Sequence, residues 1–479
     1  MLLGFVVLYL VLSIAIGLYA ASRVRNSTDY IVAGRRLPLY ITIATVFATW
    51  FGSETVFGIS ATFLEGGLNA ITADPFGSSM CLILVGVFFA RPLYRMNLLT
   101  IGDYYRRRYN RPVELATSLA IVLSYLGWVS AQLIALGLVF SLLTGGAITM
   151  TQGIVLGAAI VLVYTLFGGM WSVALTDFFQ MTIICAGMIY IAFVVSDLAG
   201  GVDVVVNHAA DAGKLEFLPA LTAKDIIAFV AAWMTIGLGS IPQQDVFQRV
   251  MSAKNENIAA WGSIIGGSLY FVFAFIPVFL AYSAFLIDPA MVEATMKDDS
   301  QLILPNLILN HTPLFAQVMF FGAILSAIMS TASGTLLAPS ATFTENILKG
   351  FLPNMDDTQF LLALRVVVVT FAICVTLFAI NSDSTIFEMV ENAYKVTLSC
   401  AFVPLAFGVY WKRATTQGAV LAIVFGLTAW ITMEIVAPEG TWPPQLVGLL
   451  ASTAGMVVGS LAPQRVASDH PVAARHPSL

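Results

Sequence analysis

The residues best suited to chemistry lie at a glycine-containing interruption of a long apolar segment. Gly52, Ser53 and Glu54 follow the run Val46–Phe51 and precede Thr55–Gly58. An unwound turn here would expose backbone carbonyl oxygens, which suit a small hard cation such as sodium. Glu54 is ionisable, and a charged side chain at the centre of a membrane helix costs about 2.5–3.5 kcal/mol on insertion scales. The alternative is a glycine kink packed against a neighbouring helix, with Glu54 in a salt bridge inside the bundle.

A second polar interruption follows later in the chain. The run Gly237–Pro242 combines residues that tolerate open backbone or remove a helical hydrogen bond. Gln243, Gln244 and Asp245 come directly after it, so this segment is a second candidate binding site. Alternatively, the helix ends at Ser240 and a loop begins at Pro242.

A cluster of hydroxyl groups occupies the run Ser326–Thr335. Ala327, Ser330, Thr331 and Gly334 approximate one helical face. Such a face, set opposite the opened segment around Gly52, could complete the oxygen shell of a sodium ion. The alternative is that small and hydroxyl residues only allow close packing between membrane helices.

Two further groups of polar residues fall inside apolar segments. Glu391 and Lys395 are spaced i, i+4, and Lys395 lies roughly 15 Å into its helix at 1.5 Å per residue. We expect Lys395 either to pair with Glu391, Glu54 or Asp245, or to bind a substrate carboxylate directly. Three other polar residues could line a cavity or merely bond between helices: Tyr125, Gln132 and Gln180.

The composition determines what kind of scaffold must hold these residues. The chain has 479 residues, of which 59% are hydrophobic and 10% are charged, against roughly 25% charged residues in a soluble domain. It is therefore predicted to be an all-α, polytopic membrane protein with about thirteen transmembrane helices. The expected helices are Leu2 to Ala21, Tyr40 to Phe63, Asp74 to Pro92, Val113 to Leu143, Gln152 to Gly168, Leu175 to Leu198, Lys224 to Gln243, Ile258 to Leu286, Leu314 to Leu348, Phe360 to Ile380, Thr385 to Trp411, Gln417 to Val436 and Pro444 to Leu461.

Charge distribution predicts the topology of these helices. With the N-terminus outside, only Lys214, Lys224 and Lys297 fall in outer loops, and almost all other basic residues are cytoplasmic, as the positive-inside rule requires. We therefore expect an outside N-terminus and an inside C-terminus in the cytoplasmic (cell) membrane. Residues 1–463 should form a single transmembrane domain, with residues 464–479 as a cytoplasmic tail. The first segment is expected to be a retained helix rather than a signal peptide.

Two interrupted helices in matching positions suggest internal symmetry. The interruptions fall five helices apart, so the segments of about 40–198 and 224–411 are predicted to be two five-helix inverted repeats. Several motifs also resemble the sodium/solute symporter family: Gly34–Pro38, Tyr164–Asp177 and Phe343–Ile347. Within that family, Ala48–Trp50 with Ile241–Pro242 and Phe247–Val250 is most similar to high-affinity choline transporters, and Met329–Thr331 resembles bacterial sodium/proline symporters.

The resemblance implies a LeuT-type fold with alternating access and a definite set of ligands. It implies one sodium ion, held by backbone oxygens of Ala48, Phe51 and Ala327 and by the hydroxyl groups of Ser330 and Thr331. It also maps two positions of an aromatic box onto Trp50 and Trp128. This chain departs from the choline transporters in having Gln243 at a third aromatic position and Ser333 in place of an acid. The full set of candidate solute-binding residues is Trp50, Ser53, Glu54, Trp128, Gln243, Gln244 and Asp245.

These observations predict a sodium-coupled symporter that imports a small polar organic solute, such as a choline-like amine or an amino acid such as proline. The alternative is a carboxylate or vitamin-type anion symporter that uses Lys395, and a remote one is a transporter-like sensor. An enzyme is not expected, because HExxH, GxSxG and Walker motifs are missing from the sequence. Sodium is the expected coupling ion, with no organic cofactor. The expected partners are the solute and the lipid bilayer, and not nucleic acid, since no basic run is interleaved with aromatic residues.

Overall fold

The part of the chain that the structure describes is built from helices. The computed structural model describes residues 1–382 and 384–466, and over these residues it contains no β-strand. The predicted all-α class is therefore confirmed. Most of the predicted cytoplasmic tail, residues 467–479, lies outside the described residues.

The α-helices vary greatly in length. In chain order they are α1 (Leu2–Ala21), α2 (Ser27–Val32), α3 (Leu39–Trp50), α4 (Ile59–Gly66), α5 (Ser78–Leu84), α6 (Ala90–Arg95), α7 (Ile101–Arg108), α8 (Arg111–Leu143), α9 (Met150–Leu198), α10 (Val202–Asp211), α11 (Ala223–Gly239), α12 (Gln244–Met251), α13 (Glu256–Ile287), α14 (Pro289–Asp298), α15 (Ile303–His311), α16 (Leu314–Thr342), α17 (Asp357–Ile380), α18 (Ile386–Thr397), α19 (Val403–Tyr410), α20 (Thr416–Val436) and α21 (Pro444–Leu461). Turns of π-helix connect several of them, at Glu54–Gly58, Thr72–Gly77, Val85–Phe89, Phe343–Ile347 and Leu398–Phe402.

The long helices begin at residues that cap them. The side chain of Asn110 accepts a hydrogen bond from the backbone N–H of Val113, and Thr149 and Gln152 form a reciprocal capping box at the start of α9. Such caps satisfy backbone N–H groups that have no partner within the helix.

Both predicted interruptions are real breaks in the helices. α3 ends at Trp50, Phe51 has a non-helical ψ of 77°, and the chain resumes in the π-turn Glu54–Gly58 and α4. α11 and α12 are bent by 48° across the segment between them. Every residue of α12 is buried, so the alternative in which Pro242 begins a loop is wrong.

The predicted count of about thirteen spans is not confirmed. Within the described residues, ten helices are long and apolar enough to cross a membrane, or eleven if the bent pair α11 and α12 is one span. One reason is that α3 is too short to qualify alone. Another is that two predicted helices join in α9, which nevertheless leaves helical geometry at Gly169 (φ 50°, ψ −139°).

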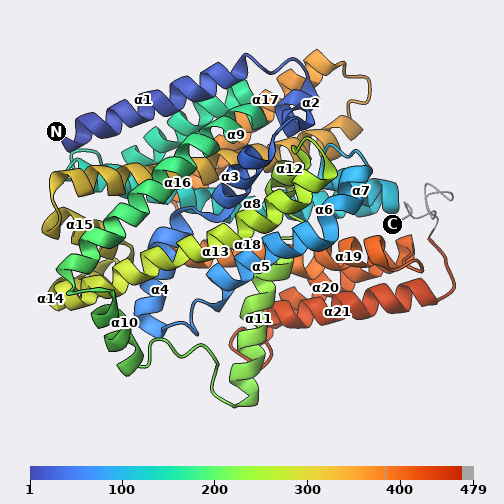
Figure 1. Ribbon diagram of the computed structural model, residues 1–479. Helices are drawn as coiled ribbons and strands as arrows, with labels where there is room; N and C mark the ends of the chain where they lie inside the picture. The colour runs from blue at the N-terminus through green and yellow to red at the C-terminus, as the bar shows by residue number, and fades with distance from the viewer. Residues whose placement is uncertain (383, 467–479) are drawn as a thin grey trace.

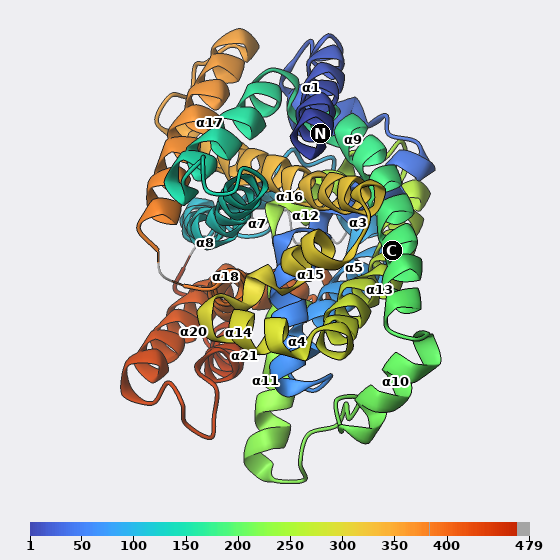
Figure 2. The ribbon, with the colours of Figure 1, turned by 90° about the vertical axis from the view of Figure 1, so that its left-hand side faces the viewer.

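The helices form one bundle around α16. α16 packs on α9 and α8 and is buried almost throughout, whereas α1 lies at the edge against α9 and exposes many apolar side chains. α20 and α21 lie side by side (Figure 1). α1 begins at the left end of the bundle in Figure 1, the end at which α14 also lies, and α21 ends at the right, beyond α7 and α19. Seen from that left end, α14 and α15 lie across the bundle (Figure 2), and Ser300–Leu302 beside them contacts Glu54–Gly58 and α4.

Gly169 provides a test of the break within α9. Its φ is positive, and a Cβ atom added there would lie 2.4 Å from the carbonyl oxygen of Tyr30. We expect Gly169→Ala to lower the stability of the folded protein by at least about 1–3 kcal/mol, the cost of a strained backbone position. Thermal unfolding in detergent measures this. Gly4→Ala is the control, because nothing lies within 4 Å of a Cβ atom at Gly4. Equal melting temperatures for the two variants would contradict the prediction.

Candidate functional site

The first break faces the hydroxyl cluster of α16. The hydroxyl group of Thr331 donates a hydrogen bond of 3.2 Å to the carbonyl oxygen of Ala48, in the last turn of α3. Ala48, Phe51, Ala327, Ser330 and Thr331 are all buried, each with an exposed fraction of 0%. The structure therefore brings two of the predicted sodium ligands, Ala48 and Thr331, into direct contact in a region shielded from solvent.

Oxygen atoms converge on Gly52. A Cβ atom at this position would lie 2.7 Å from Glu54 Oε2, 2.8 Å from Thr331 Oγ1 and 3.0 Å from Gln132 Oε1. Gln132 fixes the break, because its amide nitrogen donates to Glu54 Oε2 at 2.7 Å and its oxygen accepts from the backbone N–H of Ser53 at 3.0 Å. Only glycine leaves enough room for this arrangement.

Glu54 is buried without a cationic partner. Its exposed fraction is 1%, and Oε1 has no hydrogen-bond partner in the protein. Among the described residues, no lysine, arginine or histidine nitrogen forms an ion pair with Glu54 within 4.0 Å. The proposed salt bridge of Glu54 inside the bundle is therefore wrong. A buried carboxylate requires a compensating positive charge or a proton.

Four aromatic rings lie beside the break. Trp50 stacks on Trp128 with ring centroids 5.2 Å apart, and Tyr394 of α18 contacts both at 5.3 and 5.4 Å. Tyr125 stacks on the other side of Trp128 at 5.8 Å. The indole nitrogens of both tryptophans and the hydroxyl group of Tyr394 are buried and lack protein partners. The cluster thus combines aromatic faces with polar atoms that a small polar molecule could bond.

Residues after the second break form hydrogen bonds to α8, the helix that carries Tyr125 and Trp128 of the aromatic cluster. Asp245 accepts a 2.5 Å hydrogen bond from the hydroxyl group of Tyr125, and the side chain of Gln243 bonds Ser124 at 3.0 Å. Gln244 points elsewhere, because its oxygen accepts from the backbone N–H of Ile101 at the start of α7. Of the three predicted polar residues, Gln243 and Asp245 therefore contact the helix that carries Trp128.

A buried ion network that we did not assign to a site connects the two breaks. Asp177 of α9 accepts hydrogen bonds from Ser330, at 2.6 Å, and from Thr45. Arg249 of α12 lies 3.6 Å from Asp177 and 3.8 Å from Asp245. Both Asp177 and Arg249 occur in motifs that carry the resemblance, but a single sequence does not distinguish a buried network from a solvated loop.

Lys395 does not face the breaks. It is half-buried, and in the described part of the chain no carboxylate lies within 4.0 Å of its ammonium group. Glu54 bonds Gln132 instead, and Asp245 bonds Tyr125. Neighbouring helical residues are about 100° apart, so the same turn that directs Tyr394 into the aromatic cluster directs Lys395 away from it. Glu391 is also half-buried and interacts electrostatically with Lys395 and with Glu434 of α20.

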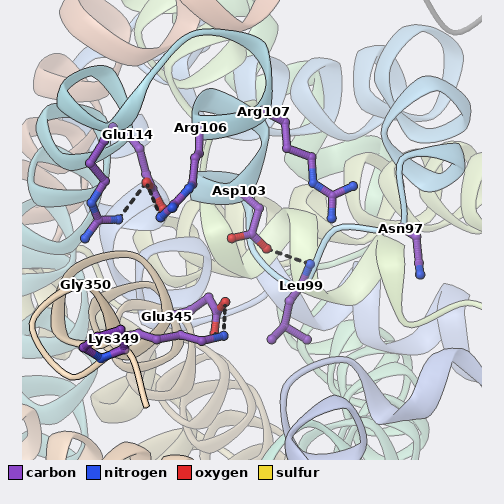
Figure 3. A pocket seen from close by; sticks show the side chains of 11 residues that line it. Asn97, Leu99, Asp103, Arg106, Arg107, Glu114, Glu345, Lys349 and Gly350 are labelled. Carbon is purple, nitrogen blue, oxygen red and sulfur yellow. Dashed lines mark hydrogen bonds and ion pairs between the residues drawn. The ribbon is translucent and has the colours of Figure 1, made fainter. Parts of the chain in front are cut away.

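A polar cavity of about 710 Å³ lies elsewhere, between α7, the start of α8 and the end of α16 (Figure 3). None of its lining residues belongs to the predicted sites. Two of its three acids form ion pairs: Glu114 lies 2.7 Å from Arg111, and Glu345 lies 2.7 Å from Lys349. The third, Asp103, accepts a hydrogen bond from the backbone N–H of Leu99. Charges at this end of the bundle are therefore largely compensated, in contrast to Glu54.

Comparison with protein families gives a match over most of the chain. Residues 30–426 match the model described as "Sodium:solute symporter family". The chain is 27% identical over 454 residues to the human high affinity choline transporter 1. The aligned region covers 90% of this chain and 76% of that protein. It is 25% identical over 480 residues to the osmoregulated proline transporter of Bacillus subtilis, with 95% and 93% covered.

Solved structures with the same fold are also transporters. A sodium-coupled sialic acid symporter in a substrate-bound outward-open state superimposes with a TM-score of 0.83 at 20% identity, over 96% of this chain and 97% of that one. MhsT in complex with L-phenylalanine superimposes with a TM-score of 0.60 at 13% identity, over 89% and 98%. The predicted LeuT-type fold is confirmed by these neighbours.

The crowding at Gly52 generates a second prediction. Gly52→Ala would push apart Glu54, Thr331 and Gln132, so we expect a loss of ion binding with little loss of helix content. Isothermal titration of the purified protein with sodium chloride, against a potassium chloride blank, measures this loss. Gly58→Ala in the same broken helix is the control, because its Cβ atom would come no closer than 3.3 Å to another atom. Unchanged sodium binding in Gly52→Ala would show that these oxygens are not part of an ion site.

Proposed function

Since this chain belongs to the sodium:solute symporter family, we propose that it imports a small organic solute bearing a positively charged nitrogen together with sodium. The chain is a multi-pass membrane protein of a sodium-coupled family. The proposed solute is a choline-like amine or an amino acid such as proline. Relatives named as choline and proline transporters support this range of solutes.

The proposed sodium site consists of the carbonyl oxygens of Ala48, Phe51 and Ala327 and the hydroxyl groups of Ser330 and Thr331. The 3.2 Å contact between Thr331 and Ala48 supports it, because two ligands of one ion must come from α3 and α16. Neutral oxygens at a helix break are suitable ligands for a hard cation. Asp177, which bonds Ser330, supplies negative charge next to this site.

The observation that carries the solute assignment is the uncompensated charge of Glu54 beside the aromatic cluster. Gln132, which bonds Glu54, and Trp128, which stacks on Trp50, are one turn apart on α8. An ammonium group in this place would neutralise the carboxylate and gain about 0.5–2 kcal/mol from each well-placed aromatic face. We therefore assign Trp50, Trp128 and Glu54 to the solute, with Ser53, Gln243 and Asp245 as neighbouring polar groups.

The alternative, a carboxylate or vitamin-type anion bound by Lys395, has less support. Lys395 is half-buried on a different face of α18 from Tyr394, and Glu54 would repel a second anion. A transporter-like sensor remains the remote alternative.

The proposed topology places the N-terminus outside and the C-terminus inside the cytoplasmic membrane. α7, with Arg106, Arg107 and Arg108 in its last turn, lies at the same end of the bundle as the end of α21 (Figure 1). α14 lies at the opposite end with the start of α1. This distribution of charge supports the positive-inside arrangement. We further propose that segments of about 40–198 and 224–411 are inverted repeats within a single transmembrane domain of residues 1–463.

Removal of the two hydroxyl ligands tests the sodium site. In the double variant Ser330→Ala/Thr331→Ala, the sodium concentration for half-maximal uptake should rise about tenfold or more, which corresponds to about 1.4 kcal/mol of lost binding. Uptake in proteoliposomes at varied sodium concentration measures this. Thr335→Ala is the control, because the hydroxyl group of Thr335 bonds only backbone oxygens of its own helix. An unchanged sodium dependence in the double variant would refute the site.

Two charge variants distinguish an amine from an anionic solute. We expect Glu54→Gln to weaken the binding of choline or proline at least tenfold, whereas Lys395→Met should leave it unchanged. Thermal stabilisation of the purified protein by a panel of choline, proline and nitrogen-free carboxylates, with and without sodium, measures this. Loss of solute binding in Lys395→Met alone would instead support the anion symporter.

A further inference from the structure

A second buried acid, Asp74, lies near the first break and has no role in the sites above. It belongs to the π-turn Thr72–Gly77, and its exposed fraction is 2%. Within the described residues no lysine, arginine or histidine pairs with it. Its neighbour Ser78 is fully buried, and its hydroxyl group lies beside the Asp74 carboxyl group without a partner at strict hydrogen-bond geometry. Asp74 is thus a buried carboxyl group that the proposed sodium and solute sites leave unexplained.

Asp74 is the end of a row of four oxygen atoms. Asp74 Oδ1 lies 2.5 Å from the hydroxyl oxygen of Tyr270 in α13, which lies 3.1 Å from the hydroxyl oxygen of Thr55. The Thr55 oxygen lies 2.8 Å from the carbonyl oxygen of Trp50. The row therefore connects Asp74 to the last residue of α3, whose indole ring belongs to the aromatic cluster.

The number of hydrogen atoms in this row decides the state of Asp74. The four oxygens make three contacts, all at hydrogen-bond distance. Each contact requires one hydrogen atom between its two oxygens. A carbonyl oxygen and a carboxylate only accept, and the two hydroxyl groups supply one hydrogen each. With Asp74 ionised, one contact would bring together two oxygens with no hydrogen between them. A protonated Asp74 supplies the third hydrogen and completes the row.

The surroundings also disfavour an ionised Asp74. α5, α11 and α13 pack against its turn. α13 contributes Tyr270, and the broken helix contributes Glu54, which repels Asp74 electrostatically. The C-terminal part of α11 packs against this turn, whereas the charged residues of α11, Lys224 and Asp225, lie in its first turn. An ionised Asp74 would have the hydroxyl groups of Tyr270 and Ser78 beside it but, within the described residues, no counter-ion.

We propose that Asp74 is a proton-binding site. In this conformation its carboxyl group carries a proton and donates it in a hydrogen bond to the hydroxyl oxygen of Tyr270. The row of hydrogen bonds then couples that proton to the carbonyl group of Trp50. The ligand is the hydrogen ion, in addition to sodium and solute. Loss of the proton would leave one oxygen pair in the row unbonded, so the helix break beside the aromatic cluster would become sensitive to pH.

Infrared spectroscopy of the purified protein near neutral pH tests the proposal without any solute. A protonated carboxyl group has a carbonyl stretching band that a carboxylate lacks. We expect such a band in the wild type, its loss in Asp74→Asn, and a shift of its frequency in Tyr270→Phe, which removes the acceptor hydroxyl group. Glu54→Gln is the control and should leave the Asp74 band in place. An identical protonated-carboxyl band in the wild type and in Asp74→Asn would overturn the proposal.

A second measurement applies even if a variant fails to fold. Labelling the aspartate carboxyl carbons of the wild-type protein with carbon-13 should shift the Asp74 component of the band, whereas labelling glutamate should shift only a component from Glu54. Asp74→Asn retains an N–H donor for Tyr270, so its melting temperature should depend less on pH than that of the wild type. A band that responds only to glutamate labelling, or equal pH dependence of the two melting curves, would refute a proton on Asp74.

Discussion

The structure depends on how backbone carbonyl groups at the two helix breaks are satisfied in an apolar environment. Each interrupted helix leaves carbonyl oxygens without an N–H partner, and such groups are costly in a membrane. Threonine hydroxyl groups fill this need at two places: Thr331 bonds Ala48, and Thr397 of α18 bonds Gly239. Thr55 adds a second hydrogen bond to the Trp50 oxygen, which also accepts from the backbone N–H of Gly52. Side chains of the helix itself and of its neighbours therefore hold the breaks open.

At the proposed sodium site, this way of holding the breaks would make them responsive to ions. The hydroxyl group of Thr331 directs its hydrogen at the Ala48 carbonyl oxygen in this conformation. A sodium ion bound by both oxygens would require that hydrogen to turn away, because a cation and a hydroxyl hydrogen compete for the same lone pairs. Binding of sodium thus exchanges a hydrogen bond between α3 and α16 for an ion contact between them. Such an exchange couples the occupancy of the site to the relative position of two helices.

Local signals in the sequence were sufficient to locate the breaks and to select candidate residues beside them. Glycine, proline and polar residues inside apolar runs identify both interruptions without knowledge of the fold. The contacts that depend on distant segments were not predictable: the burial of Asp74 requires Tyr270, 196 positions away, and the choice of Tyr394 over Lys395 depends on how α18 is rotated against α3. Tyr125 and Gln132 were visible as polar residues, but only packing shows that they face the breaks.

The charge balance around the breaks connects the three proposed ligands. Four buried acids, Glu54, Asp74, Asp177 and Asp245, lie in this region, and the buried cation among them is Arg249. If all ionise, the region carries four negative charges and one positive charge, a formal excess of three negative charges. Low-dielectric surroundings do not tolerate such an excess. One sodium ion, one solute with a net positive charge, such as choline, and one proton on Asp74 would restore neutrality. If all three bind as proposed, the departure of any one of them would leave an uncompensated charge and destabilise the region, so the release of one would favour the release of the others.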